Sequence, residues 1–248
     1  MKNKRIIIII VCITVGFLTV PVFHLLRTYF KEDSVIRFTP EGYTDDASGL
    51  NLTKVHSIIQ VPSHKDDIVL QLRNILEYAE KNNKRISIAG AKHSMGGHTI
   101  YPDGILLNMR PYNSMSLDTV NNILTIGSGA LWSDALQYLN KYDRSVSVMQ
   151  AFSSFSIGGS ISVNGHGWQH NAPPVSSTIV SFSIMKADGQ VLECDREENR
   201  ELFGLAIGGY GLFGIILDIK LRVVNNRSLT FKSYKFRSDE YIDHFEEY

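Results

Sequence analysis

Two glycine-rich stretches constrain the fold of this chain more than any other feature. One covers residues 90–97 (GAKHSMGG) and directly follows a predicted strand. The other covers residues 156–160 (SIGGS) and opens a helix of small residues that leads to residues 164–167. Because glycine has no Cβ, a glycine-lined turn lets backbone N–H groups approach a phosphate closely. Two such turns in one domain indicate a ligand with two phosphates, which predicts a dinucleotide cofactor.

Composition excludes several other classes of protein. The 248 residues suffice for one large domain or two small ones, and 25 Lys and Arg balance 25 Asp and Glu. This balance argues against a nucleic-acid partner, which selects a basic face. Cys12 lies in an apolar run and Cys194 in the globular part, so we expect no internal disulfide framework. No Cys and His cluster has the spacing of metal ligands, so we predict no metal.

The start of the chain has the pattern of a membrane anchor. Residues 1–5 are basic, and residues 6–23 form an apolar run close to the shortest that crosses a bilayer. We predict a single-pass transmembrane helix there, with a signal peptide as the alternative. The basic start predicts a membrane protein whose globular domain is extracytoplasmic, although Arg27 and Lys31 weaken that orientation. Residues 24–51 are interpreted as a linker.

The remaining pattern predicts an α+β domain, because strands and helices mix without regular alternation. A helix is expected after Pro62, with Ser63 as its N-cap and Asp66 and Asp67 in its first turn. The pair 188–189 (DG) is a hairpin signal. Strands are expected at residues 57–61, 85–89, 105–108, 114–118, 123–127, 180–184, 191–194 and 215–224, and further helices at 131–141 and 199–207.

Residues 209–214 (GYGLFG) match the G-x-G-x-x-G pattern, but in the reverse context. A Rossmann turn needs a strand before it and a helix after it, so that the helix N-terminus meets the pyrophosphate. Here a predicted helix precedes the motif and a predicted strand follows it. This order argues against a soluble NAD-binding dehydrogenase, while the glycines still indicate a tight backbone crossing beside a flat ligand.

The motifs at 89–94, 157–160, 164–167 and 208–216 occur in an order that resembles a known family. Together they are similar to the PCMH-type FAD-binding domain of the vanillyl-alcohol oxidase / p-cresol methylhydroxylase flavoproteins. Within it, the chain looks closest to sugar-type members, namely aldonolactone oxidases, alditol oxidases and decaprenylphosphoryl-ribose oxidase. The resemblance implies an FAD-binding domain over residues 52–226. Residues 227–248 would then start a truncated substrate or cap domain.

The resemblance also implies two α+β subdomains with FAD stretched between them. The first loop would hold the pyrophosphate, the second would lie against flavin and phosphates, residues 164–166 would pass near the isoalloxazine, and Ile215 would cover the adenine or ribose side. The alternative is that the glycines serve only turns. The implied cofactor-binding residues are Gly90, Ala91, Lys92, His93, Ser94, Met95, Gly129, Ser156, Ile157, Gly158, Gly159, Val163, Asn164, Gly165, His166, Gly214 and Ile215.

The most specific predictions for single residues concern histidines. In many relatives a Gly-His-Ser sequence at the first loop carries FAD through a covalent bond, which implies attachment through His93. Lys92 stands where such relatives have glycine, and a histidine that only donates to phosphate or backbone is the alternative. Nearby His98 is interpreted as an ordinary loop residue. His166 is the candidate catalytic residue, because an imidazole beside the flavin can orient a hydroxyl or share its proton.

The function that the resemblance implies is an FAD-dependent oxidoreductase. It would oxidise a CH–OH group of a sugar, sugar lactone or polyol by hydride transfer to flavin N5, with oxygen or a membrane carrier as reoxidant. Relatives carry the catalytic base and substrate pocket in a cap domain, so we name no base here and expect a separate cap-domain chain as one possible partner. The alternative is a membrane-tethered flavin-binding protein without catalysis.

Overall fold

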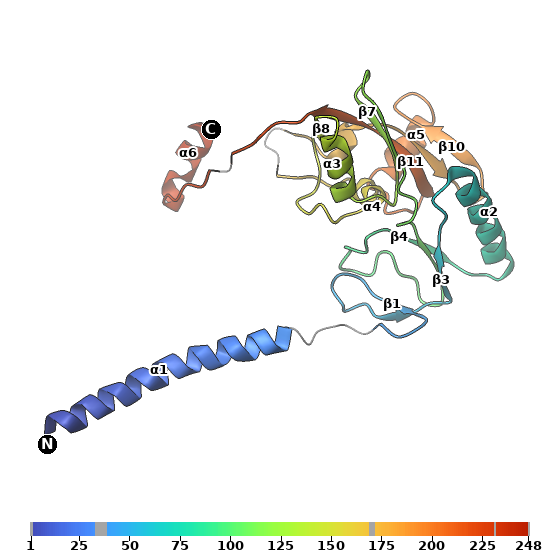
Figure 1. The fold of residues 1–248 in the computed structure, drawn as a ribbon. Helices are drawn as coiled ribbons and strands as arrows, with labels where there is room; N and C mark the ends of the chain where they lie inside the picture. Colours follow the sequence, from blue (N-terminus) through green and yellow to red (C-terminus); the bar gives the residue numbers. More distant parts are fainter. Residues whose placement is uncertain (1, 33–38, 169–171, 231, 248) are drawn as a thin grey trace.

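The computed structural model describes residues 2–32, 39–168, 172–230 and 232–247 (Figure 1). Side chains are described within these ranges except at residues 2–3, 5–13, 31–32 and 246–247. The described chain forms two larger sheets with helices packed on them and a small two-stranded sheet. A long N-terminal helix precedes them and a short C-terminal helix follows.

The first subdomain is a parallel sheet in the order β3-β5-β4. It contains β3 (Ser57–Gln60), β4 (Ile86–Ala89) and β5 (Ile105–Asn108). Helix α2 (Lys65–Lys81) connects β3 to β4, and its apolar positions recur at helical spacing. Its buried side chains are Ile68, Leu72, Ile75 and Ala79.

The second subdomain is an antiparallel sheet in the order β10-β9-β11-β7-β6, with β8 also paired to β11. Its long central strand, β11 (Ile215–Asn225), pairs with three others, so this strand organises the sheet. The other strands are β6 (Met115–Asp118), β7 (Ile123–Gly127), β8 (Arg144–Val146), β9 (Ile179–Met185) and β10 (Val191–Cys194).

Helices cover the second sheet on both faces. Buried residues of α3 (Trp132–Asn140), α4 (Ile157–Ser162) and α5 (Arg200–Ala206) form one core with β7, β9 and β11. Helix α2 and the first sheet form another core, which takes in Met185, Ile215 and Leu217 from the second sheet. The two subdomains therefore share a hydrophobic core, which fixes one against the other.

A buried polar contact adds to this junction. The Tyr112 hydroxyl donates to Asp218 on β11 at 2.6 Å, and Lys65 at the start of α2 forms an ion pair with the same carboxylate at 2.7 Å. Burial, together with the neighbouring Asp218 carboxylate, raises the pKa of Tyr112 far above its ordinary value, so the phenol stays a donor.

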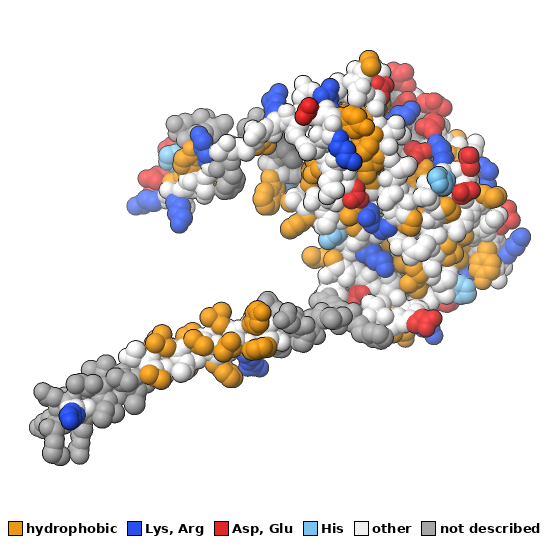
Figure 2. Space-filling model, in the orientation of Figure 1, with side chains coloured by type: hydrophobic (Ala, Val, Ile, Leu, Met, Phe, Trp, Pro, Cys, Tyr) orange, Lys and Arg blue, Asp and Glu red, His pale blue; other side chains and the backbone are white. Residues whose placement is uncertain are grey.

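Helix α1 (Lys2–Glu32) extends away from the sheets, and its described side chains are exposed and largely apolar (Figures 1 and 2). Among the described residues, including the described part of α1, no helix is long and apolar enough to cross a membrane. The predicted anchor at 6–23 therefore lacks structural support, and side chains 6–13 of that run lie outside the description. Further along, His24 and Arg27 interrupt the apolar sequence.

The segment predicted as a linker contains packed structure. Strand β1 (Tyr43–Thr44) pairs with β2 (Thr53–Lys54), and Thr44 and Asp46 are buried. Residues 24–32 of the predicted linker belong to α1. The sequence over 30–54 is polar, so periodicity gave no strand signal there. The strands form because Asp and Ser side chains satisfy the turn that joins them.

Most predicted elements are confirmed within a residue or two, including the helix over 157–162 and the antiparallel hairpin of β6 and β7. The predicted N-cap of α2 was wrong. His64, not Ser63, occupies that position with an extended backbone, and no side chain caps the helix. Asp66 and Asp67 lie in the first turn, where their charges favour the helix dipole. The C-terminal segment forms η2 (Ser238–Glu240) and α6 (Tyr241–Glu247).

Truncating the α2 core should test the shared core. Leu72 is fully buried there, whereas Leu70 on the same helix is 62% exposed. We expect Leu72→Ala to lower the free energy of unfolding by about 2–5 kcal/mol, because it leaves a cavity between the two subdomains. Leu70→Ala should change it by less than about 0.5 kcal/mol. Urea unfolding followed by circular dichroism measures both, and equal effects would contradict the assigned core.

Candidate functional site

A cavity of about 480 Å³ lies where the two glycine-rich stretches meet. Its walls come from β4 and the following loop, from α4, from the loop after α5, and from the start of β11. Among the residues predicted to bind the cofactor, those that line it are Gly90, Ala91, Lys92, His93, Ser94, Met95, Ser156, Gly158, Gly159, Val163 and Gly214. The structure thus brings together residues far apart in the sequence, as the glycine pattern predicts.

Neither Gly90 nor Gly158 has room for a side chain, because each packs closely against a serine. A Cβ built on Gly90 would lie 1.9 Å from Ser156 Oγ, and one on Gly158 would lie 2.9 Å from the Ser128 carbonyl oxygen. The Ala91 N–H donates to Ser156 Oγ at 3.3 Å and so joins the loops directly. The glycines at these two positions are therefore required by packing as well as by any ligand.

The first loop leaves backbone donors without protein partners. Within the described chain, the N–H groups of residues 92–95 donate to no protein atom. Lys92 has a left-handed backbone (φ +55°), the conformation that glycine adopts most easily. Such a run of N–H groups beside a cavity can take an anion.

Several hydroxyls at the cavity are also without partners in the described chain. The oxygens of Ser87, Ser94, Thr99 and Ser128 are shielded from solvent, make no hydrogen bond there, and belong to residues that line the cavity. A buried hydroxyl without a partner is unfavourable, so these groups indicate a polar ligand. Backbone N–H groups, bare glycines and free hydroxyls form a donor set that suits a diphosphate with ribose or ribityl hydroxyls.

Aromatic rings border the cavity at two places. His93 packs on Phe155 with ring centroids 4.5 Å apart, and His98 lies 5.5 Å from Tyr210. All four residues line the cavity. His98, predicted to be an ordinary loop residue, lies in the loop after β4 and lines the cavity. Tyr210 comes from the 209–214 motif, which places a tight backbone crossing beside the cavity, since Gly211 and Gly214 both have positive φ.

Six predicted residues do not line the cavity. Ile157 and Ile215 are buried in the cores, Gly165 packs against Gln150, and Gly129 packs against the Met109 carbonyl. Asn164 has a positive φ and accepts a hydrogen bond from the Ser176 N–H. His166 is exposed, and its Nδ1 lies 3.0 Å from the Gly167 carbonyl oxygen. The structure therefore gives His166 no contact with the cavity, and its catalytic role stays a prediction.

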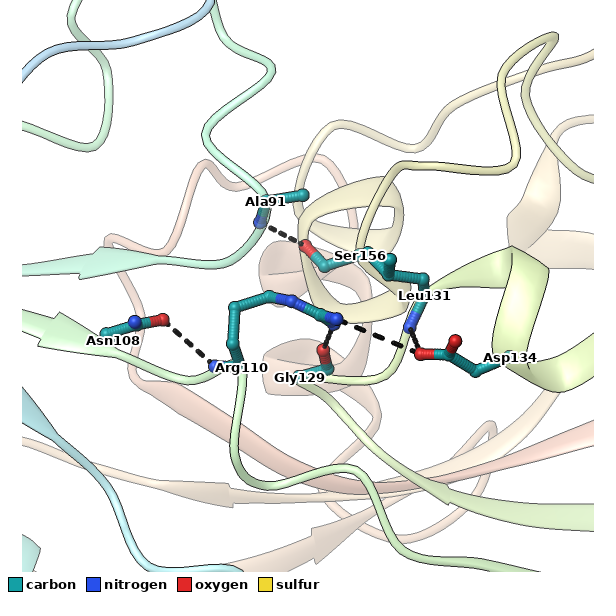
Figure 3. A network of polar contacts seen from close by, with 7 residues as sticks. All are labelled: Ala91, Asn108, Arg110, Gly129, Leu131, Asp134 and Ser156. Atoms are coloured by element: carbon teal, nitrogen blue, oxygen red, sulfur yellow. Dashed lines mark hydrogen bonds and ion pairs between the residues drawn. The ribbon is translucent and has the colours of Figure 1, made fainter.

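A polar network fixes the segment behind the second glycine stretch (Figure 3). The Arg110 guanidinium donates to the Gly129 carbonyl and lies 3.8 Å from the Asp134 carboxylate. Asp134 in turn accepts the Leu131 N–H at 3.1 Å. Asn108 accepts the Arg110 N–H at the end of β5, so the network connects the first sheet to the start of α3. It fixes Gly129 rather than placing a charge in the cavity.

Sequence reasoning missed Gln150 and assigned Ser160, within the second glycine-rich stretch, no contact of its own. Trp132 Nε1–H donates to Ser160 Oγ at 2.8 Å, and that hydroxyl contacts Gln150 Oε1. This chain leads from a fully buried indole to a glutamine at the cavity wall. A single polar residue in a loop carries no periodic signal, so only the tertiary structure could have identified it.

The comparisons with known proteins agree with this geometry. A family model described as FAD binding domain matches residues 62–195. The chain belongs to this FAD-binding family. The assignment to the vanillyl-alcohol oxidase / p-cresol methylhydroxylase flavoproteins is confirmed, as is FAD as the cofactor.

Curated relatives match this chain over only part of their own length. L-gulonolactone oxidase from Mus musculus is 28% identical over 71% of this chain and 40% of its own length. L-gulonolactone oxidase from Scyliorhinus torazame is 30% identical over 63% of this chain and 36% of its own length. Cytokinin dehydrogenase 9 from Oryza sativa subsp. japonica is 27% identical over 64% of this chain and 32% of its own length. The matched region thus spans less than half the length of these relatives.

A solved structure shares the fold. 6-Hydroxy-D-nicotine oxidase from Arthrobacter nicotinovorans superposes with a TM-score of 0.60 at 23% identity, over 63% of this chain and 35% of that protein. The PCMH-type mixed fold, with its two subdomains, is therefore confirmed. The cavity between the two glycine stretches fits FAD, because its free donors and bare backbone suit the diphosphate.

The contact between the two glycine stretches is open to a direct test. Gly90→Ala should reduce bound flavin at least about tenfold, because the new methyl group displaces Ser156 and separates the loops. Removing the Ser156 side chain in a Gly90→Ala/Ser156→Gly double variant should restore part of the binding. Flavin absorbance per mole of purified protein gives the readout.

Gly204→Ala is the matched control, since no atom lies within 4 Å of the Cβ it adds in α5. Circular dichroism checks that each variant is folded. Full flavin content in a folded Gly90→Ala variant would show that the close approach of the loops is not needed for the cofactor.

Proposed function

We propose that the protein is an FAD-dependent oxidoreductase that oxidises a CH–OH group of a sugar, sugar lactone or polyol. The observation that carries the proposal is the cavity where bare backbone and unpartnered hydroxyls meet, in a chain of the FAD-binding family. The L-gulonolactone oxidases among its relatives support the lactone and sugar class of substrate.

The residues of this chain serve to bind and orient the cofactor. N–H groups of residues 92–95 would hold the diphosphate, and Ser94 and Ser128 would add hydroxyl donors nearby. When bound, FAD supplies an acceptor for two electrons, with hydride passing to flavin N5. The wall formed by His93 and Phe155 would exclude water from one side of the bound ring.

A flavin-binding protein without catalysis is the second candidate. The relatives are named as oxidases and dehydrogenases, which favours the enzyme. The cytokinin dehydrogenases leave room for a substrate of another class, so the sugar and lactone preference rests on the gulonolactone oxidases and on the 208–216 motif.

Three further features stay predictions from the sequence. These are membrane attachment through 6–23 with an extracytoplasmic domain, a separate cap-domain chain, and a catalytic role for His166. The first needs a membrane, the second a partner chain and the third a bound substrate. Extraction of the protein from membranes by carbonate or by detergent would test the first.

Covalent attachment through His93 has a specific readout. His93 lines the cavity on the same loop as the free N–H groups, which is compatible with a bond to the flavin ring. After acid denaturation, we expect the yellow colour to stay with the unaltered polypeptide and to leave the His93→Ala variant. His98→Ala, which changes the other histidine that lines the cavity, should keep the colour. Colour retained by His93→Ala would exclude this attachment point.

Turnover distinguishes the two candidate functions. Under anaerobic conditions, the visible absorbance of oxidised flavin should fall when an aldonolactone or polyol substrate is added, because hydride transfer reduces the ring. Dithionite provides the fully reduced reference. If dithionite bleaches the protein and no member of an aldonolactone and polyol panel does, the non-catalytic candidate is the better account.

A further inference from the structure

A short segment before the matched family region packs directly on the cofactor loop. We call residues 43–51 the N-terminal arm and residues 90–97 the glycine loop. The arm lies outside residues 62–195, which the family model covers. It begins with β1 and ends just before β2, so the pairing of Tyr43 with Lys54 and of Thr44 with Thr53 holds it on the first subdomain.

Four hydrogen bonds join the arm to the glycine loop. The Ala47 N–H donates to the Lys92 carbonyl at 2.9 Å, and Lys92 Nζ donates to Thr44 Oγ1 at 2.7 Å. The Gly97 N–H donates to Asp46 Oδ2 at 2.8 Å, and Asn51 Nδ2 lies 3.5 Å from the Met95 carbonyl oxygen. These contacts hold the loop at Lys92 and at Met95 to Gly97, and none of them uses the N–H groups of residues 92–95.

Asp46 is the central acceptor of this contact. Only 8% of its surface is exposed, and it also accepts from Ser48 and Asn51 within the arm. Burial alone would raise the pKa of this carboxyl, but the hydrogen bonds from Ser48, Gly97 and Asn51 outweigh burial and lower it. The group is therefore an ionised acceptor, and a hydrogen bond to an ionised group is stronger than one between neutral groups.

The backbone conformation of Lys92 explains why the loop needs contacts from outside to stay in place. Its φ of +55° is unfavourable for any residue with a Cβ, by about 1 kcal/mol or more. The surroundings must therefore over-determine this conformation. Two hydrogen bonds stabilise it: the Lys92 carbonyl accepts from the Ala47 N–H, and the Lys92 ammonium donates to Thr44 Oγ1. Thr44 is only 1% exposed.

We propose that the N-terminal arm positions the glycine loop for FAD, with Thr44 and Asp46 as the positioning residues. This inference rests on the proposed binding of FAD by the loop. Neither residue would need to contact the cofactor. Their effect is to keep the 92–95 donors oriented before the ligand arrives, so that binding does not bear the cost of ordering them.

The test is a titration with FAD of flavin-free, full-length chain that carries His93→Ala, so that binding is reversible; quenching of flavin fluorescence reports binding. Binding by this chain, otherwise unaltered, is measured first, and if neither it nor the chain with His93 takes up FAD the proposed function itself fails. Asp46→Asn and Thr44→Val should each raise the FAD dissociation constant about tenfold or more, as expected for loss of a charge-assisted hydrogen bond. The thermal midpoint of the flavin-free chain is recorded for each variant.

Asp118→Asn is the matched control. Asp118 also accepts two backbone N–H groups, from Val120 and Asn121, but does so in the exposed β6–β7 hairpin and outside the cavity. Its variant should keep the FAD affinity of the unaltered chain. The proposal is overturned if Asp46→Asn and Thr44→Val bind FAD as tightly as the unaltered chain. It is also overturned if Asp118→Asn lowers the thermal midpoint and the FAD affinity as much as the two arm variants do, because general destabilisation would then explain all three results.

Discussion

The close approach of Gly90 to Ser156 is the contact on which the site depends. It brings a loop of the parallel sheet against the start of α4, which belongs to the antiparallel sheet. Because Gly90 has no Cβ, the Ser156 side chain packs directly on the loop backbone, and Gly158 packs closely against Ser128. The shared core around α2 holds both sheets in place, so the cavity is a consequence of how the subdomains pack.

The chemistry of the cavity follows from what this packing leaves unpaired. Backbone N–H groups of residues 92–95 and four shielded hydroxyls have no partner in the described chain. Leaving such groups unpaired reduces stability, and a ligand that accepts their hydrogen bonds recovers it. A diphosphate-bearing cofactor meets this requirement. The glycine loop itself is strained at Lys92, and the N-terminal arm supplies the bonds that keep it in that conformation.

Much of the fold could be predicted because local signals are strong where they exist. The apolar spacing of α2 and the turn between β6 and β7, where Asn122 adopts a positive φ, are written in short stretches of sequence. The N-terminal arm could not be predicted this way, since its strands are two residues long and its bonds reach residues about fifty positions away. The positions of His98, Gln150 and Tyr210 at the cavity could not be predicted for the same reason, because they depend on how segments far apart in the sequence pack together.

The sequence by itself determined the family, the cofactor class and which backbone segments are bare, because glycine spacing limits what a turn can do. It also placed His93 on the loop that lines the cavity. The tertiary structure decided which predicted residues face the cavity, since Ile157, Ile215 and His166 turn elsewhere. It decided as well that a polar segment predicted as a linker packs on the glycine loop. Side-chain direction and long-range hydrogen bonds depend on the packing of whole subdomains, which no local pattern encodes.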